Sequence, residues 1–188
     1  MGATEVTPVL SISGISGGGK STLVQAVRDH LPGAGVVRFD GFSFDQRPEA
    51  PAAAVTVADP IRAFNQYDLT DLAAAIQAAQ QNHAIVIVDY PFGRVNRQIA
   101  PLIDLAFYVQ TPLDVAFARA LRRDYAAADT TKADILAWAK AYLTQARPLF
   151  VVHDTVVSQH VDQVIDGMRP LAEKVKTVVD ALRAQQLI

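Results

Sequence analysis

The residue types best suited to chemistry gather near the start of the sequence, where glycines, a lysine and hydroxyl side chains follow an apolar run. Residues 14–21 read GISGGGKS and fit the pattern G-x-x-x-x-G-K-[ST] of a phosphate-binding loop, the P-loop. Because glycine has no β-carbon, successive backbone N–H groups can face one concavity and bind phosphate oxygens. In such a loop Lys20 neutralises charge on the β- and γ-phosphates, and the Ser21 hydroxyl ligates Mg²⁺. We therefore expect a nucleotide bound with Mg²⁺ by Gly14, Ser16, Gly17, Gly18, Gly19, Lys20, Ser21 and Thr22.

Two aspartates follow predicted strands and are candidates for work beside the phosphates. Asp89 ends the apolar run AIVIVD, as does an aspartate that holds Mg²⁺ directly or through water; strand-end aspartates also form turns and caps. Asp40 follows another strand, on the sheet edge where ligands gather in α/β proteins. Its carboxylate could accept the proton of an attacking hydroxyl, or Asp40 with the next glycine could simply form a turn. Asp45 is a weaker candidate for the same base.

These residues need strands and helices to bring them together. Runs rich in β-branched residues at 9–12, 36–39, 84–88, 105–109 and 161–165 are predicted strands. Most are continuous apolar runs, which is typical of strands buried on both faces of a parallel sheet. Helical periodicity lies between them, and this alternation predicts a doubly wound α/β domain. The 188 residues show no repeat or internal boundary and suit one domain.

Each of four predicted helices begins with a capping oxygen or with a proline. These signals are Asp68 with Asp71 as N-cap and N3, Thr111 as cap before Pro112, Thr131 with Asp134, and Pro170. Residues 41–67 form the least regular segment, and a loop of that length is usually functional. Residues 150–159 fit either a strand or a loop. Trp138 and Tyr142 share one helix face and are expected to pack, whereas His30, His83, His153 and His160 show no metal-ligand spacing and are expected at the surface or at helix ends.

Composition and charge exclude several classes of protein. A net charge of −2 provides no general field for nucleic acid or an anionic membrane, so we expect neither as a partner. The longest apolar run is too short to span a bilayer, and the amino terminus lacks the pattern of a signal peptide. The sequence contains no cysteine, which excludes disulfides and thiolate sites and favours a cytoplasmic location.

Six segments in order resemble the uridine kinase and phosphoribulokinase group of P-loop kinases, which includes nicotinamide riboside and type I pantothenate kinases. They are GISGGGKSTL, FDGF, DPIRAF, VDYPF, IDLAFYVQTPLDVAFARALRRD and YLTQARPLF. The resemblance covers residues 9–167, nearly the whole chain. It implies an α/β three-layer P-loop NTPase sandwich with a five-stranded parallel sheet, in a single kinase domain over residues 1–188 with a short helical lid at about 119–132.

The resemblance also implies ATP with Mg²⁺ as donor and a hydroxyl of a small metabolite as acceptor. Lys20 and Asp40 would then be catalytic, with Asp40 at the position of the family's base. Asp89 takes the place of a family glutamate that works beside the metal, and Arg119 and Arg123 match lid arginines that close on the phosphates. Arg122 has no clear counterpart, and apart from the resemblance such an arginine cluster would be a solvated helix face.

The sequence departs from this group where uridine kinases recognise the base. Their base-contacting hairpin has no room in QNHAIVIV, and after the lid's RRD the family often has another arginine that is absent here. We therefore expect weak or no uridine kinase activity and a better acceptor among other hydroxylated metabolites, such as nicotinamide riboside, pantothenate or sugars. Acceptor contacts are expected from Phe42, Phe44, Asp45, Arg62, Phe64, Tyr90 and Arg94.

The leading hypothesis is an ATP-dependent small-molecule kinase of uridine kinase-like type. One alternative is a nucleoside monophosphate kinase, whose second phosphate could be bound by Arg47, Arg62 and Arg94. Another is a nucleotide-dependent switch protein with no small acceptor, although the Asn-Lys-x-Asp guanine motif is absent. The oligomeric state is open, a homodimer included.

Overall fold

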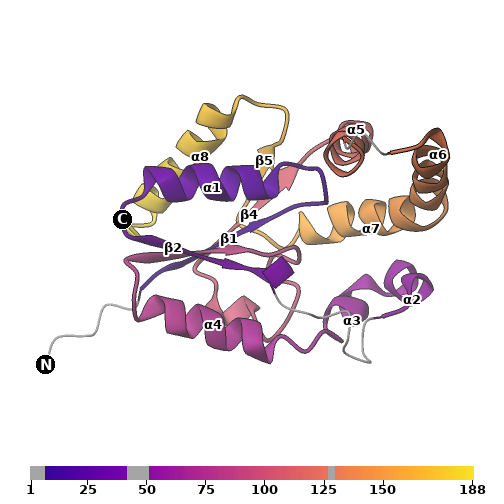
Figure 1. Ribbon diagram of the computed structural model, residues 1–188. Coiled ribbons are helices and arrows are strands. Elements are labelled where there is room, and N and C mark those ends of the chain that lie inside the picture. The colour runs from indigo at the N-terminus through magenta and orange to yellow at the C-terminus, as the bar shows by residue number, and fades with distance from the viewer. Residues whose placement is uncertain (1–6, 42–50, 127–129) are drawn as a thin grey trace, which may run out of the picture.

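The computed structural model describes residues 7–41, 51–126 and 130–188, and one sheet of five parallel strands forms its centre (Figure 1). The sheet has the order β2-β3-β1-β4-β5. Its strands are β1 Val9–Ser13, β2 Ala34–Arg38, β3 Ile85–Asp89, β4 Leu105–Gln110 and β5 Gln163–Asp166. Each lies within two residues of a predicted strand, which confirms the predicted five-stranded α/β architecture.

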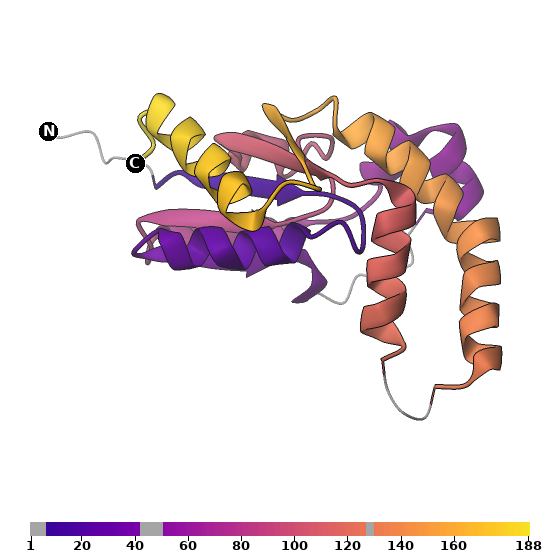
Figure 2. The same ribbon diagram turned by 90° about the horizontal axis from the view of Figure 1, so that it is seen from above.

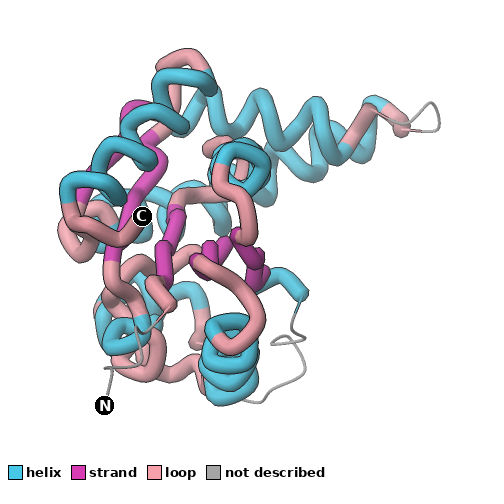
Figure 3. The backbone as a smooth tube through the Cα atoms, turned by 90° about the vertical axis from the view of Figure 1, so that its left-hand side faces the viewer, coloured by secondary structure: helices cyan, strands magenta, loops and turns pink. Residues whose placement is uncertain are grey.

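Helices cover both faces of the sheet. On one face lie α1 Lys20–His30 and α8 Leu171–Ala184, and on the other lies α4 Thr70–Gln80 (Figures 1 and 3). Alternate strand residues supply the two cores: Leu10 and Ile12 pack with α1 and α8, whereas Val9 and Val86 pack with α4. The helices and the sheet thus form the predicted three-layer α/β sandwich. In the described part of the chain no helix has the length and apolar character needed to cross a membrane.

A helical arm follows β4 and extends away from the sheet (Figure 2). It consists of α5 Leu113–Asp124, α6 Lys132–Ala141, a π-helical turn Tyr142–Ala146 and α7 Arg147–Val157. The start of α6 is confirmed, because Thr131 and Asp134 form a reciprocal capping box. The ambiguous segment 150–159 is mainly helix, since α7 runs through it.

Two capping predictions were wrong in detail. The N-cap of α4 is Leu69, and Asp68 instead accepts hydrogen bonds from the N–H and hydroxyl of Thr70. The N-cap of α5 is Pro112, and the Thr111 hydroxyl bonds to the P-loop rather than to the helix. In both cases the helix begins later than its strongest capping residue suggests. The side chain of that residue bonds elsewhere, locally to Thr70 for Asp68 and to the distant P-loop for Thr111.

The segment expected to be one long loop contains regular structure. It holds α2 Ala53–Ala58 and α3 Pro60–Phe64, and β2 continues into a 3₁₀ turn Phe39–Gly41. The Asp59 side chain accepts a hydrogen bond from the Arg62 N–H, and Pro60 occupies the first turn of α3. Another short 3₁₀ turn, Ala100–Leu102, precedes β4.

Candidate active site

The glycine-rich loop between β1 and α1 has a shape that only glycine permits at two positions. Gly17 has φ of +75°, and a β-carbon there would lie 2.2 Å from the carbonyl oxygen of Ala116 in α5. Gly19, the N-cap of α1, has φ of +93°. Since residues with a side chain rarely adopt these angles, the loop depends on both glycines to turn onto the helix. The resulting amino-terminal end of α1 is a favourable place for phosphate.

Thr111, the residue that follows β4, holds this loop in place through a hydrogen bond. The hydroxyl of Thr111, buried at 2% exposure, donates a 2.8 Å hydrogen bond to the carbonyl oxygen of Gly18. Gly167, after β5, packs so closely on Thr111 that a β-carbon would lie 1.8 Å from the hydroxyl oxygen. Sequence reasoning missed this role because the contact joins residues 93 positions apart.

Lys20 and Asp89 meet at the centre of the site. Lys20 is the first residue of α1 and Asp89 the last residue of β3, the strand next to β1. The Lys20 ammonium donates a hydrogen bond to an Asp89 carboxylate oxygen, and Asp89 is only 3% exposed. Because both charges are largely removed from water, each depends on the other until a ligand supplies new partners.

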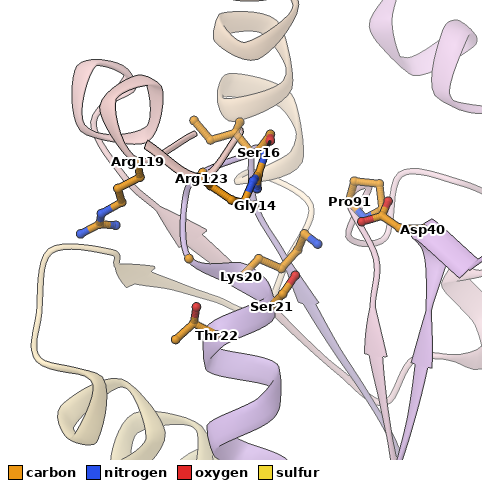
Figure 4. Close-up of a pocket in the computed structure, with 12 residues that line it drawn as sticks. Gly14, Ser16, Lys20, Ser21, Thr22, Asp40, Pro91, Arg119 and Arg123 are labelled. Carbon is orange, nitrogen blue, oxygen red and sulfur yellow. Dashed lines mark hydrogen bonds between the residues drawn. The ribbon is translucent and has the colours of Figure 1, made fainter. Parts of the chain in front are cut away.

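Asp40 and two arginines complete a cavity of about 460 Å³ around Lys20 (Figure 4). Its lining residues are Gly14, Ile15, Ser16, Gly17, Gly19, Lys20, Ser21, Thr22, Asp40, Pro91, Arg119 and Arg123. Asp40 and Arg119 lie on opposite sides of Lys20. Asp40 is exposed and makes no hydrogen bond or ion pair with the described residues. Its carboxylate is therefore available to a ligand.

Arg123 is held at the edge of the cavity and remains charged. It forms a 2.6 Å ion pair with Asp124, and its Nη2 lies 3.5 Å from the Ser16 hydroxyl oxygen. The hydrogen bond to Asp124 raises the pKa of Arg123, and the charges of Asp124 and Asp40 act in the same direction. Arg122, by contrast, is exposed and is not among the residues that line the cavity.

Those of the expected acceptor-binding residues that the structure describes do not line this cavity. Phe64 and Tyr90 are 4% and 0% exposed and belong to the core between the sheet and α4, so their side chains are buried away from a ligand. Burial raises the pKa of Tyr90, and its hydroxyl has no hydrogen-bond partner within the described part of the chain. Arg62 is exposed on α3. Phe42, Phe44, Asp45 and Arg47 lie outside the described residues.

Arg94 points away from the nucleotide end of the sheet. Its guanidinium donates to the carbonyl oxygens of Ile103 and Asp104 and forms a 2.7 Å ion pair with Asp162. These partners immediately precede β4 and β5, whereas the P-loop lies at the opposite, carboxyl ends of the strands. The expected acceptor contact at Arg94 is therefore corrected to a structural one.

A histidine expected at a surface or helix end lies instead inside an aromatic cluster. His153, in the middle of α7, packs at ring-centroid distances of 5.8 Å from Phe64 and 5.9 Å from Tyr108. The Tyr108 hydroxyl lies 3.3 Å from its Nδ1. Burial lowers the pKa of His153 from 6.5 to about 4, so the ring is neutral near pH 7. The described residues contain no group of three or more His, Cys, Asp or Glu side chains that could hold a metal ion.

The donor atoms at the loop suit Mg²⁺ bound together with phosphates. Magnesium prefers oxygen ligands and keeps several waters, so one or two protein oxygens suffice beside a nucleotide. The Ser21 hydroxyl lines the cavity and the Asp89 carboxylate lies beside Lys20. The turn at Gly17 and Gly19, whose positive φ angles favour glycine, brings the amino-terminal end of α1 to this cavity.

Solved structures with the same architecture include kinases. The deoxyadenosine kinase from M. mycoides with bound dCTP superposes with a TM-score of 0.53 at 14% identity, over 94% of this chain and 99% of that one. The protein APE1195 gives 0.54 at 16% identity, over 97% and 98%. An uncharacterized protein from Eubacterium ventriosum gives 0.51 at 12% identity, over 94% and 98%. At such identities the likeness establishes the fold alone. No protein-family model and no curated protein matches the sequence.

Proposed function

We propose that this protein is an ATP-dependent kinase that phosphorylates a hydroxyl of a nucleoside or another small metabolite. The observation that carries the proposal is the convergence of the P-loop, the Lys20–Asp89 pair, Asp40 and the arginines Arg119 and Arg123 on one cavity. A phosphate-binding loop alone would suit any nucleotide-binding protein. An available carboxylate across the cavity from lid-type arginines suits transfer to a hydroxyl.

Each side chain has a role in that reaction. Asp40 accepts the hydroxyl proton as the acceptor oxygen bonds to the γ-phosphorus and the bond from that phosphorus to the bridging oxygen of ADP breaks. Lys20, Arg119 and Arg123 offset charge on the transferring group. Ser21 and Asp89 would hold Mg²⁺, which neutralises phosphate charge when bound. Asp89 would have to exchange its bond to Lys20 for the metal, while Lys20 turns to the phosphates.

The acceptor is less tightly defined than the donor. A deoxyadenosine kinase among the structural neighbours supports a nucleoside-type acceptor. The connection between α4 and β3 consists only of residues 81–84, which leaves no base-contacting hairpin of the uridine kinase kind. Each hydrogen bond that is missing from a recognition site makes binding of the base less favourable by about 1–3 kcal/mol. We therefore expect uridine to be a poor acceptor. The chain would act as one kinase domain, with α5 and the start of α6 as its lid.

The test is ADP release with ATP and Mg²⁺ in the presence of single acceptors. The panel contains deoxyadenosine, cytidine, uridine, nicotinamide riboside, pantothenate and simple sugars, with AMP, CMP and UMP as phosphate-bearing acceptors. Acceptor-dependent ADP release that disappears in Lys20→Ala supports the proposal. Turnover only with the monophosphates would favour a nucleoside monophosphate kinase. ATP hydrolysis unaffected by every acceptor would favour a nucleotide-dependent switch and contradict the proposal.

A further inference from the structure

A second cavity opens beside the first, between α5 and the helices that follow it. It has a volume of about 220 Å³ and is lined by four aromatic and four alanine side chains of α5, α6, the π-helical turn and α7, with Ser16, Asp124 and Gln145 as its polar residues. The members used below are Ser16, Phe117, Trp138, Tyr142, Gln145 and Phe150. All of these lining residues belong to the described part of the chain.

The aromatic rings of this cavity pack against one another from different helices. Phe117 of α5 lies 4.8 Å from Trp138 of α6 and 4.4 Å from Tyr142, measured between ring centroids. Trp138 and Tyr142 are nearly parallel, with an interplanar angle of 23°, and Phe150 lies 6.0 Å beyond Tyr142. Small side chains at Ala116, Ala120 and Ala141 line the space between the rings. An aromatic wall of this kind suits a planar ring, which it can contact by offset stacking or edge to face.

The backbone is irregular at this wall. The N–H of Arg147 bonds to the carbonyl oxygen of Tyr142, five residues earlier, as in a π-helix. Pro148 lies in the next turn and has no N–H, so it cannot continue the ordinary hydrogen-bond pattern to Thr144. Short π-helical turns are frequent at functional sites. The π-helical turn also carries Gln145, which lines the cavity and whose side chain makes no hydrogen bond with described residues. A glutamine amide can offer the edge of a bound ring both a hydrogen-bond donor and an acceptor.

The second cavity lies next to the nucleotide cavity, and the two share one lining residue. Ser16 of the P-loop lines both cavities, and Arg123 lies 3.5 Å from its hydroxyl oxygen. The negative charge of Asp40 contributes to the raised pKa of Arg123. Arg119 lies on the opposite side of Lys20 from Asp40. The aromatic cavity thus adjoins the cavity that the candidate base Asp40 lines.

We propose that the cavity lined by Phe117, Trp138, Tyr142 and Phe150 binds the aromatic ring of the phosphate acceptor, while the acceptor's hydroxyl lies in the adjoining cavity near Asp40. This assignment rests on the proposed kinase function and narrows its acceptor to a hydroxylated compound that carries a planar, heteroaromatic ring. Since typical small-molecule sites measure about 300–1,000 Å³, a cavity of about 220 Å³ suits a ring rather than a whole acceptor.

Trp138 provides a direct test, because it is the only tryptophan in the sequence. Its fluorescence should change saturably when nucleotide-free protein is titrated with deoxyadenosine, cytidine or nicotinamide riboside, and should not change with ribose. This readout needs no turnover, so it tests the cavity even if the kinase proposal fails. No saturable change with any ring-bearing probe would overturn the assignment. A saturable change with a non-hydrolysable ATP analogue that abolishes the response to these probes would place the donor's adenine in the cavity and also overturn it.

A matched pair of variants on α6 separates the cavity from general effects on the helix. Ala141 lines the cavity, and Ala137, one turn earlier, is exposed and does not. Ala141→Leu should raise KM for the ring-bearing acceptor at least about tenfold, as expected when a well-fitted contact worth about 1.4 kcal/mol is lost, and should leave affinity for the ATP analogue unchanged. Ala137→Leu should match wild type. Equal effects of the two substitutions, or efficient turnover of ring-free acceptors alone, would refute the assignment while leaving the kinase proposal intact.

Discussion

Lys20 and Asp89 form an ion pair that joins the first residue of α1 to the last residue of β3. Both are the residues that the sequence pattern assigns to the nucleotide and its metal. Each satisfies the other's charge, and nucleotide binding would have to replace that bond with bonds to phosphate and Mg²⁺. Because Lys20 would then contact phosphate and Asp89 the metal, substitution of each residue should impair a different part of the reaction.

Substitution Lys20→Ala should abolish phosphoryl transfer. It removes an ammonium that offsets charge on the transferring group, and loss of one such group typically costs about 10²-fold or more in kcat. The measurement is single-acceptor ADP release, with Lys176→Ala, an exposed lysine on α8, as the control for loss of a positive charge. Wild-type turnover by Lys20→Ala would contradict the mechanism.

Substitution of Asp40 and substitution of Asp89 should change different kinetic properties. Asp40→Asn removes the proton acceptor and should lower kcat by about 10²–10⁴-fold with little change in affinity for the ATP analogue. Asp89→Asn weakens an oxygen ligand for the metal and should raise the Mg²⁺ concentration needed for half-maximal rate. A Mg²⁺ titration of both variants distinguishes them. If Asp40→Asn keeps the wild-type rate, another residue must act as the base, and Asp45 is the next candidate.

The three neighbouring arginines should not be equivalent. Arg119 and Arg123 line the nucleotide cavity and Arg122 does not. Removing a cation that stabilises transition-state charge costs about 10²–10³-fold in kcat, so Arg119→Ala and Arg123→Ala should show that loss. Arg122→Ala, equal in charge change, should stay near wild type. A similar loss in all three variants would indicate a general electrostatic effect of α5 instead.

The stability of the protein should fall in mild acid because of His153. Burial lowers the pKa of this imidazole from 6.5 to about 4, so between these pH values the unfolded chain binds a proton that the folded chain does not. Since the unfolded state then holds more protons, the free energy of unfolding decreases as pH drops from 6.5 toward 4, by at most about 3 kcal/mol, and is fully present above 6.5.

Urea unfolding at pH 7 and pH 4.5 checks this dependence. The difference in unfolding free energy between the two pH values should be smaller in His153→Gln than in wild type. His30→Gln, at an exposed position, should leave the difference unchanged. An unchanged pH dependence in His153→Gln would show that other groups control the acid sensitivity.

The strands and the P-loop were predictable because their signals are local. A buried parallel strand is a short apolar run, and the glycines at 17 and 19 mark a turn that no other residue forms easily. The helix α3 could also have been recognised, since Asp59 followed by Pro60 is a cap with a proline in the first turn. The interpretation of residues 41–67 as one loop gave too little weight to that signal.

Other parts of the site depend on contacts between distant segments. Thr111 has the sequence signature of a helix cap, and only the approach of β4 to the P-loop makes its hydroxyl a partner of Gly18. Tyr90 and Phe64 lie near the expected acceptor site in the sequence but face the core. The aromatic cavity combines residues from four helical segments and the P-loop, and no single stretch of sequence indicates it.

The bond between Thr111 and Gly18 also belongs to a longer chain of contacts. Gly167 packs against the Thr111 hydroxyl, and the buried Lys174 of α8 donates a 3.1 Å hydrogen bond to the Gly167 carbonyl oxygen. The phosphate-binding loop is thereby braced by α8, a helix that follows it far along the sequence. A ribosome synthesises α8 after the loop, so a nascent chain would contain all residues of its phosphate-binding loop well before it could form the contacts that brace the loop.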